Sequence, residues 1–165
     1  MPKDTPTIHR LFADGQRQFA AGVEAEIEAY VEKSLLDDLS DIKANYRDQD
    51  GSNFWVAEVD GQVRGMFSLQ RRSEREGELR RLSVDIEYRR RGIAQTLLET
   101  AEAYAREQGY TSLRLSTITP LKPAIALYEK FGYREYGKDR YGAITVLHFT
   151  KNLVSERGSS GGGQS

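Results

Sequence analysis

One short segment of the chain combines residue types suited to holding a phosphorylated ligand. Residues 84–94 join an expected strand to an expected long helix, and they end in Arg89, Arg90, Arg91, Gly92, Ile93 and Ala94. The first N–H groups of a helix have no intrahelical acceptor and carry partial positive charge, so they attract anions. Gly92 and Ala94 would let a ligand approach the backbone, and the arginines would neutralise phosphate oxygens. The segment predicts a pyrophosphate site.

The alternative interpretation is that the three arginines are solvated surface charge. Their position between a strand and a helix, with glycine and alanine following, favours the anion site. Other phosphate motifs fit less well, because the sequence has neither a P-loop nor the glycine-rich dinucleotide fingerprint after a strand. This pattern disfavours a nucleotide triphosphatase or a dehydrogenase.

The elements that must position this segment alternate between strands and helices. Hydrophobic periodicity predicts a strand over 7–12, helices over 16–33 and 35–46, and a hairpin of 54–59 and 62–69 around Asp60-Gly61. Further elements are expected as a strand at 78–84, a helix from 93 to Gly109, a strand at 112–117, a short helix from Pro123 to Gly132, and strands at 133–136 and 144–150. The order β-α-α-β-β-β-α-β-α-β-β predicts an α/β or α+β fold with a mixed sheet.

Composition excludes several classes of protein. The 165 residues and 18.7 kDa suit one domain, and the absence of cysteine removes thiolate nucleophiles and cysteine-ligated metals. His9 and His148 are the only histidines, so no metal site is predicted. A net charge of −1 disfavours nucleic-acid or anionic-membrane partners. No apolar run reaches bilayer length and the polar N-terminus lacks a signal-peptide core, so we expect a cytoplasmic protein.

The motifs resemble those of the GCN5-related N-acetyltransferases, the GNAT superfamily. Arg89-x-x-Gly92-x-Ala94 matches the Q/R-x-x-G-x-G/A signature of that family, and residues 78–84 look like the strand that precedes it. Residues 124–133 resemble the A-x-x-L-Y-x-K-x-G-F helix, and 54–67 resemble the hairpin of the second and third strands. The resemblance covers about residues 7–152. It implies the acyl-CoA N-acyltransferase fold: one domain over 1–154 with a mixed, mostly antiparallel sheet of about seven strands and four helices. Residues 155–165 are expected to form a flexible Gly/Ser-rich tail.

What the resemblance implies is direct transfer of an acetyl group from acetyl-CoA to an amine. The pyrophosphate of acetyl-CoA would bind the backbone of residues 89–94, and its pantetheine arm would pair with Leu82, Ser83 and Val84. Many relatives contact pantetheine through an asparagine near the start of the later helix. Here that segment is 120–123, so the contact is either absent or supplied by Thr117 or Thr119; Lys122 could instead form an ion pair with a CoA phosphate.

Three residues are candidates for proton transfer. Glu78 occupies the position where family members carry a base that deprotonates the amine, with Glu58 as a second candidate. The alternative for Glu78 is a strand-edge charge paired with Arg80 or Arg114. Tyr128 matches the tyrosine with which relatives protonate the leaving CoA thiolate; the alternative is a core aromatic residue.

The amine itself is not identified by the sequence, and both a small molecule and a protein amine remain open. Acidic and aromatic residues would surround the acceptor entrance or form a solvated helix face: Glu24, Glu26, Glu28, Glu32, Asp37, Asp38, Asp41, Tyr30, Trp55, Tyr136 and Tyr141. A non-catalytic acyl-CoA-binding module is the alternative function. Nucleic-acid binding by the arginines between 71 and 91 is disfavoured by the near-neutral charge. Because dimers are frequent among relatives, a homodimer is compatible with the resemblance.

Overall fold

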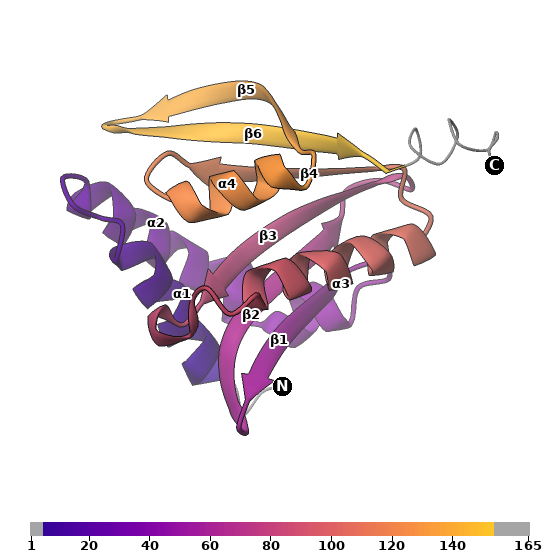
Figure 1. Cartoon of the computed structure of the whole chain (residues 1–165), viewed down its shortest axis with the longest axis horizontal. Coiled ribbons are helices and arrows are strands. Elements are labelled where there is room, and N and C mark those ends of the chain that lie inside the picture. Colours follow the sequence, from indigo (N-terminus) through magenta and orange to yellow (C-terminus); the bar gives the residue numbers. More distant parts are fainter. Residues whose placement is uncertain (1–4, 154–165) are drawn as a thin grey trace.

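A six-stranded mixed sheet forms the centre of the computed structural model, which describes residues 5–153 (Figure 1). Its strands run in the spatial order β1-β2-β3-β4-β6-β5. They are β1 (Asn53–Val59), β2 (Gln62–Arg71), β3 (Glu76–Val84), β4 (Ser112–Ile118), β5 (Arg134–Tyr141) and β6 (Ile144–Asn152). One face packs against α1 (Thr5–Arg17) and α2 (Glu24–Leu36), and the other against α3 (Ile93–Glu107) and α4 (Lys122–Lys130). Two hydrophobic clusters, one on each face, make up the core.

The N-terminal segment differs from the expectation. Residues 7–12 are part of the helix α1, and the strand predicted there is wrong, so the sheet has six strands instead of about seven. Ile8, Leu11, Phe12 and Gly15 are all buried, and their spacing of three and four residues is that of one helix face. Asp14-Gly15 continues the helix instead of ending it, and a Cβ added to the buried Gly15 would lie 3.4 Å from the Ser83 Oγ of β3.

The second expected helix is also wrong. Residues 35 and 36 still belong to α2, and the chain beyond them forms two short helical turns, a 3₁₀ turn at Asp38–Ser40 and a π turn at Lys43–Arg47. The periodicity still reports burial correctly, since Leu39, Ile42 and Tyr46 lie in the core under α1 and α2. The chain leaves the helical path where the Asp38 side chain turns inward, with 4% of the residue exposed.

The first expected helix, over 16–33, is wrong as one element, because α1 ends at Arg17, α2 begins at Glu24 and a loop separates them. The hairpin signal at Asp60-Gly61 is confirmed. Asp60 and Gly61 both have positive φ, at 53° and 79°, as a type I′ turn between β1 and β2 requires. The strand and helix that flank the arginine-rich segment are β3 and α3. No helix within residues 5–153 has both the length and the apolar character needed to cross a bilayer.

The central strands β3 and β4 separate part-way along their length. They pair in parallel only from Glu76↔Ser112 to Leu79↔Leu115, while β3 stays paired with β2 and β4 stays paired with β6 beyond that point. The pairing of β2 with β3 shifts register between Met66 and Ser68, and Arg81 of β3 has a left-handed φ of 67°. This bulge turns Arg80 and Arg81 to the same face of the sheet, where both contact Asp38.

A buried ion pair holds the bulge in place. The Arg81 Nε donates to Asp38 Oδ2 at 3.0 Å, a second guanidinium nitrogen donates to the other carboxylate oxygen, and Tyr46 donates its hydroxyl proton to the same carboxylate. Both charged side chains are almost fully buried, at 3% and 4% exposed. Burial by itself would raise the pKa of Asp38, but the hydrogen bonds and positive charge of Arg81 outweigh it and lower that pKa.

Removing the carboxylate should destabilise the fold strongly. Asp38→Ala leaves the Arg81 charge buried without a partner, so we expect a loss of about 3–5 kcal/mol in the free energy of unfolding measured in urea at pH 7. Because the folded pKa of Asp38 lies below the unfolded value of about 3.9, the wild type should lose this stability as the pH falls below about 4. The exposed neighbour provides the control: Asp37→Asn should change stability by less than about 0.5 kcal/mol. A loss below about 1 kcal/mol for Asp38→Ala would contradict the assignment.

Candidate functional site

A cavity of about 510 Å³ lies where β3 and β4 separate. Its floor consists of residues 79–82 of β3 and 116–118 of β4, and Tyr128 of α4 closes one side. Phe12, Tyr30 and the turn between β5 and β6 line the other side. The cavity therefore reaches the two faces of the sheet through the gap between the strands.

Tyr128 is the predicted acid, and it lines this cavity with 5% of its surface exposed. Its ring packs edge-on against Tyr133 at a centroid distance of 5.9 Å. Among residues 5–153 its hydroxyl has no hydrogen-bond partner. Burial, with a smaller contribution from Tyr30, raises the pKa of Tyr128 well above that of an exposed tyrosine. The hydroxyl therefore stays protonated and is available to donate a hydrogen bond to a ligand.

The arginine-rich turn leads into the N-terminus of α3, as expected. Arg90 and Gly92 have positive φ values of 65° and 80°, and α3 begins at Ile93 without a side-chain cap. A Cβ added to Gly92 would meet no atom within 4 Å, so the space beside this backbone is open. Arg90 and Arg91 are exposed. The turn thus presents uncapped N–H groups and two cationic side chains on one exposed segment.

Arg89 has a different role from its two neighbours. Its guanidinium lies over the Phe19 ring at 5.2 Å and donates to the Val84 carbonyl at 3.4 Å. The Gln18 amide, oriented so that its oxygen faces the guanidinium, accepts a further hydrogen bond from Arg89 Nη2 at 2.9 Å. Arg89 therefore ties the turn to the loop between α1 and α2.

The residues predicted to bind pantetheine fall into two groups. Leu82 and Thr117 line the cavity, and the Thr117 side chain has no hydrogen-bond partner among the described residues. Ser83 and Val84 stay paired with β2 and do not line the cavity, and Thr119 is engaged with Thr145. Lys122 is exposed at the start of α4.

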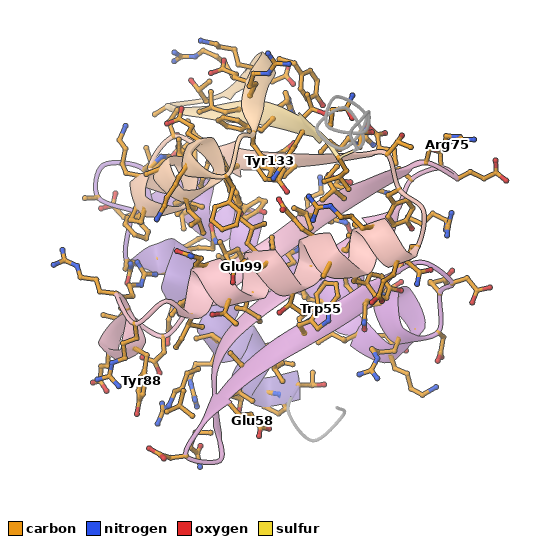
Figure 2. All side chains as sticks on the ribbon, turned by 45° about the vertical axis from the view of Figure 1, so that its right-hand side comes forward. Trp55, Glu58, Arg75, Tyr88, Glu99 and Tyr133 are labelled. Atoms are coloured by element: carbon orange, nitrogen blue, oxygen red, sulfur yellow. The ribbon has the colours of Figure 1, made fainter. Side chains whose placement is uncertain are left out.

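The two glutamates considered as bases lie away from the cavity. Glu78 forms an ion pair with Arg72, and Arg72 also donates to Gln70. Glu58 is exposed on β1, near the tip of the β1–β2 hairpin, as Figure 2 shows. Neither side chain lines the cavity with Tyr128. The structure therefore brings neither of them together with the predicted acid.

The acidic and aromatic residues proposed for the acceptor side separate in the structure. Glu26, Tyr30 and Tyr141 line the cavity, and the Glu26 carboxylate accepts a hydrogen bond from the Ala143 N–H at 3.2 Å. Trp55 packs instead against Tyr104 of α3 on the other face (Figure 2). Most of the remaining acidic residues are exposed, as on a solvated face: Glu24, Glu28, Glu32, Asp37 and Asp41.

One group of polar side chains in the site was missed by the sequence reasoning. Ser116 Oγ lies 2.7 Å from His148 Nδ1, and His148 Nε2 lies 2.8 Å from an Asp139 carboxylate oxygen. Ser116 also lines the cavity. The alternation of side chains along each strand predicts the face on which Ser116 or His148 lies. Only the register between β4 and β6 shows that the two residues are opposite each other.

Comparison with known proteins agrees with this architecture. The acetyltransferase (GNAT) family model matches residues 19–133. The chain belongs to the GNAT acetyltransferase family. It is 37% identical over 139 residues to human N-acetyltransferase 8, an alignment that covers 78% of this chain and 61% of that protein. The chain thus spans about 60% of the length of N-acetyltransferase 8 relatives that it matches.

Solved structures of the family share the fold. A GNAT acetyltransferase from Staphylococcus aureus aligns over 93% of this chain and 95% of its own, with a TM-score of 0.77 and 22% identity. A putative streptothricin acetyltransferase from Bacillus anthracis, in complex with acetyl coenzyme A, aligns over 69% of each chain with a TM-score of 0.62 and 20% identity. The GNAT fold expected from the motifs is therefore confirmed.

The burial of Tyr128 can be tested by alkaline titration. Since its pKa is raised above the unfolded value of about 10, Tyr128→Phe should leave the ultraviolet tyrosinate titration of the native protein unchanged up to about pH 11. The control is the same titration in concentrated urea, where the variant should show one tyrosinate fewer than the wild type. Loss of a titrating group near pH 10 in the native variant would show that the Tyr128 hydroxyl is freely solvated.

Proposed function

We propose that this chain transfers the acetyl group of acetyl-CoA to an amine. The observation that carries the proposal is the cavity at the separated strands, which the largely buried Tyr128 side chain lines and where its hydroxyl has no hydrogen-bond partner among the described residues. Family membership supports the same activity, as does the acetyl coenzyme A complex formed by a protein of the same fold.

The residues present fit this cosubstrate. The uncapped N-terminus of α3 and the exposed Arg90 and Arg91 suit the pyrophosphate. Leu82 and Thr117, on the two strand edges that no longer pair with each other, suit the amide groups of pantetheine. Gln16 Oε1 is a buried acceptor without a partner, on a residue that lines the same cavity. Acetyl-CoA supplies the thioester whose acetyl group is transferred.

Tyr128 provides the proton for the departing sulfur. A thiolate is a fair leaving group, and a hydrogen bond from a nearby hydroxyl stabilises the charge that develops on the sulfur. Even an exposed tyrosine is protonated at neutral pH, and burial raises the pKa of Tyr128 further, so this donor is in place before the reaction begins. The acceptor amine would enter on the opposite face, between α2 and the β5–β6 turn, past Glu26, Tyr30 and Tyr141.

Binding of CoA is tested by thermal unfolding. Millimolar CoA should raise the melting temperature by about 5–10 °C if it stands at about a hundred times its dissociation constant. Gly92→Ala forces a side chain into a left-handed conformation and should reduce CoA affinity about tenfold by distorting the turn. Gly22→Ala is the matched control, since Gly22 has a φ of 85° and open space around it but lies outside the site. An absence of any shift with CoA would overturn the proposed function.

The role of Tyr128 is tested kinetically. Tyr128→Phe should lower kcat about a hundredfold while the dissociation constant for acetyl-CoA stays within about twofold, since the lost hydrogen bond matters chiefly as the sulfur departs. Tyr104→Phe, which removes a half-buried hydroxyl outside the cavity, serves as the control. An unchanged kcat would remove Tyr128 from the reaction. Binding of acetyl-CoA without turnover of any amine would instead indicate a non-catalytic acyl-CoA-binding module.

A further inference from the structure

Three polar side chains from three adjacent strands form a continuous hydrogen-bonded chain at the cavity. Ser116 comes from β4, and His148 lies directly opposite it on β6, in register. The Oγ–Nδ1 distance is 2.7 Å, and Asp139 of the edge strand β5 accepts from the far nitrogen of the ring at 2.8 Å. A hydroxyl, an imidazole and a carboxylate in this order are the parts of a proton relay.

The carboxylate determines which nitrogen of His148 can act as a base. An ionised Asp139 only accepts hydrogen bonds, so Nε2 must carry the proton that it accepts. In the neutral ring Nδ1 then has a free lone pair, and the Ser116 hydroxyl donates to it. The contact is therefore oriented so that a proton reaching Ser116 can pass to His148.

The position of Ser116 connects the relay to the cavity. Leu115 is the last residue of β4 that pairs with β3, so Ser116 lies at the point where the strands separate. Leu115 packs in the cluster on the α3–α4 face, whereas Ile118, two residues beyond Ser116, packs in the cluster with α1 and α2. Ser116 thus opens toward α1 and α2, and Tyr128 comes from the other face.

We propose that Ser116 and His148 remove a proton from the acceptor ammonium, with Asp139 as the residue that positions the imidazole. This inference rests on the proposed acetyl transfer and assigns the base of that reaction. It places the base on the acceptor face of the gap and the Tyr128 acid on the opposite face. Glu78 is not used, because it is paired with Arg72 and lies outside the cavity.

The protons and bonds balance in this scheme. One N–H bond of the ammonium breaks as its proton moves to Ser116 Oγ, while the Ser116 proton moves to His148 Nδ1. The neutral amine then forms a C–N bond to the acetyl carbon, and the C–S bond breaks. A second N–H bond of the amine breaks as the amide forms. Its proton replaces the one that Tyr128 gives to the CoA sulfur, which leaves as the thiol. His148 finally releases its proton to solvent beside Asp139, whose side chain is 67% exposed.

Several other charged or titratable groups face Ser116 and His148, and they contribute to the pH dependence of the rate. On β5 the ring of Tyr136 lies 5.9 Å from that of His148. The remaining groups that line the cavity, or lie on the same face of β4, are Glu26 and Lys33 of α2, Tyr30, Arg80 and Arg81, Tyr141, and Arg114. Arg81 is already neutralised by Asp38, and Arg114 lies near Glu76.

The test is a pH–rate profile of four variants with defined acceptors. The wild type is first assayed with acetyl-CoA and four amines: L-leucine, L-leucinamide, spermidine and a lysine tripeptide blocked at both ends. With the amine that is acetylated fastest, kcat/KM is then measured from pH 6 to pH 10 for Ser116→Ala, Ser116→Thr, His148→Gln and Asp139→Asn. His9→Gln and Glu135→Gln are the controls, since they change the chain's other histidine and a β5 carboxylate that does not contact His148.

A relay predicts a loss that depends on pH. His148→Gln and Ser116→Ala should be about a hundredfold slower than the wild type near pH 7 and should approach it near pH 10, where the free amine is abundant. Ser116→Thr keeps the hydroxyl and should retain most of the rate, and Asp139→Asn should fall in between. A loss of the same size at every pH would overturn the proposal. Absence of turnover by the wild type would refute the proposed function instead.

A second measurement needs no acceptor. In nitrogen-15 spectra at neutral pH, His148 should show a protonated Nε2 and an unprotonated Nδ1, and this preference should weaken in Asp139→Asn. The opposite tautomer would contradict the relay. Mass spectrometry of the wild type after incubation with acetyl-CoA alone should find Ser116 unmodified; an acetylated Ser116 would mean that it is a nucleophile and would also overturn the proposal.

Discussion

The site depends on the buried ion pair between Arg81 and Asp38. Arg81 has a left-handed backbone conformation, which costs a residue other than glycine about 1–2 kcal/mol. The structure keeps that conformation because the guanidinium finds a carboxylate 43 residues away in the chain, with Tyr46, Ser34 and Tyr30 completing its surroundings. The bulge lies just beyond the last β3–β4 pair, so the same contact that fixes the strand also shapes the floor of the cavity.

The separated strands give the cavity access to both faces of the sheet, and the two faces differ chemically. On one face α3 offers an uncapped N-terminus and α4 offers Tyr128, which together suit a phosphorylated thioester. On the other face α2 and the β5–β6 turn surround an entrance that contains Glu26 and Lys33. Arg89 links the two sides, because it belongs to the arginine-rich turn before α3 and packs on Phe19 of the loop between α1 and α2.

The features that the sequence predicted are those set by local chemistry. The Asp60-Gly61 hairpin, the turn at Gly92 and the helix that carries Tyr128 each depend on residues within a few positions of one another. The errors concern contacts between distant segments. Residues 7–12 are too few to distinguish a strand from one face of a helix, and the partner of Glu78 depends on how β2 meets β3. Likewise, Ser116 and His148 are unremarkable polar residues of two strands until the register places them opposite each other.

The proposed acid and the proposed base relay differ in their exposure to solvent. This difference agrees with where each proton goes: one to the departing sulfur, the other from the ammonium to bulk water. In the proposed transfer Tyr128 gives its proton to the departing sulfur and regains one from the amine, so this donor can be buried. The proton taken from the ammonium must reach bulk water in every turnover. The proposed path begins at Ser116, an exposed residue that lines the cavity, and ends beside Asp139 on the edge strand, where the carboxylate is mostly exposed. A base buried as deeply as Tyr128 would keep that proton, and with it a charge whose burial is costly.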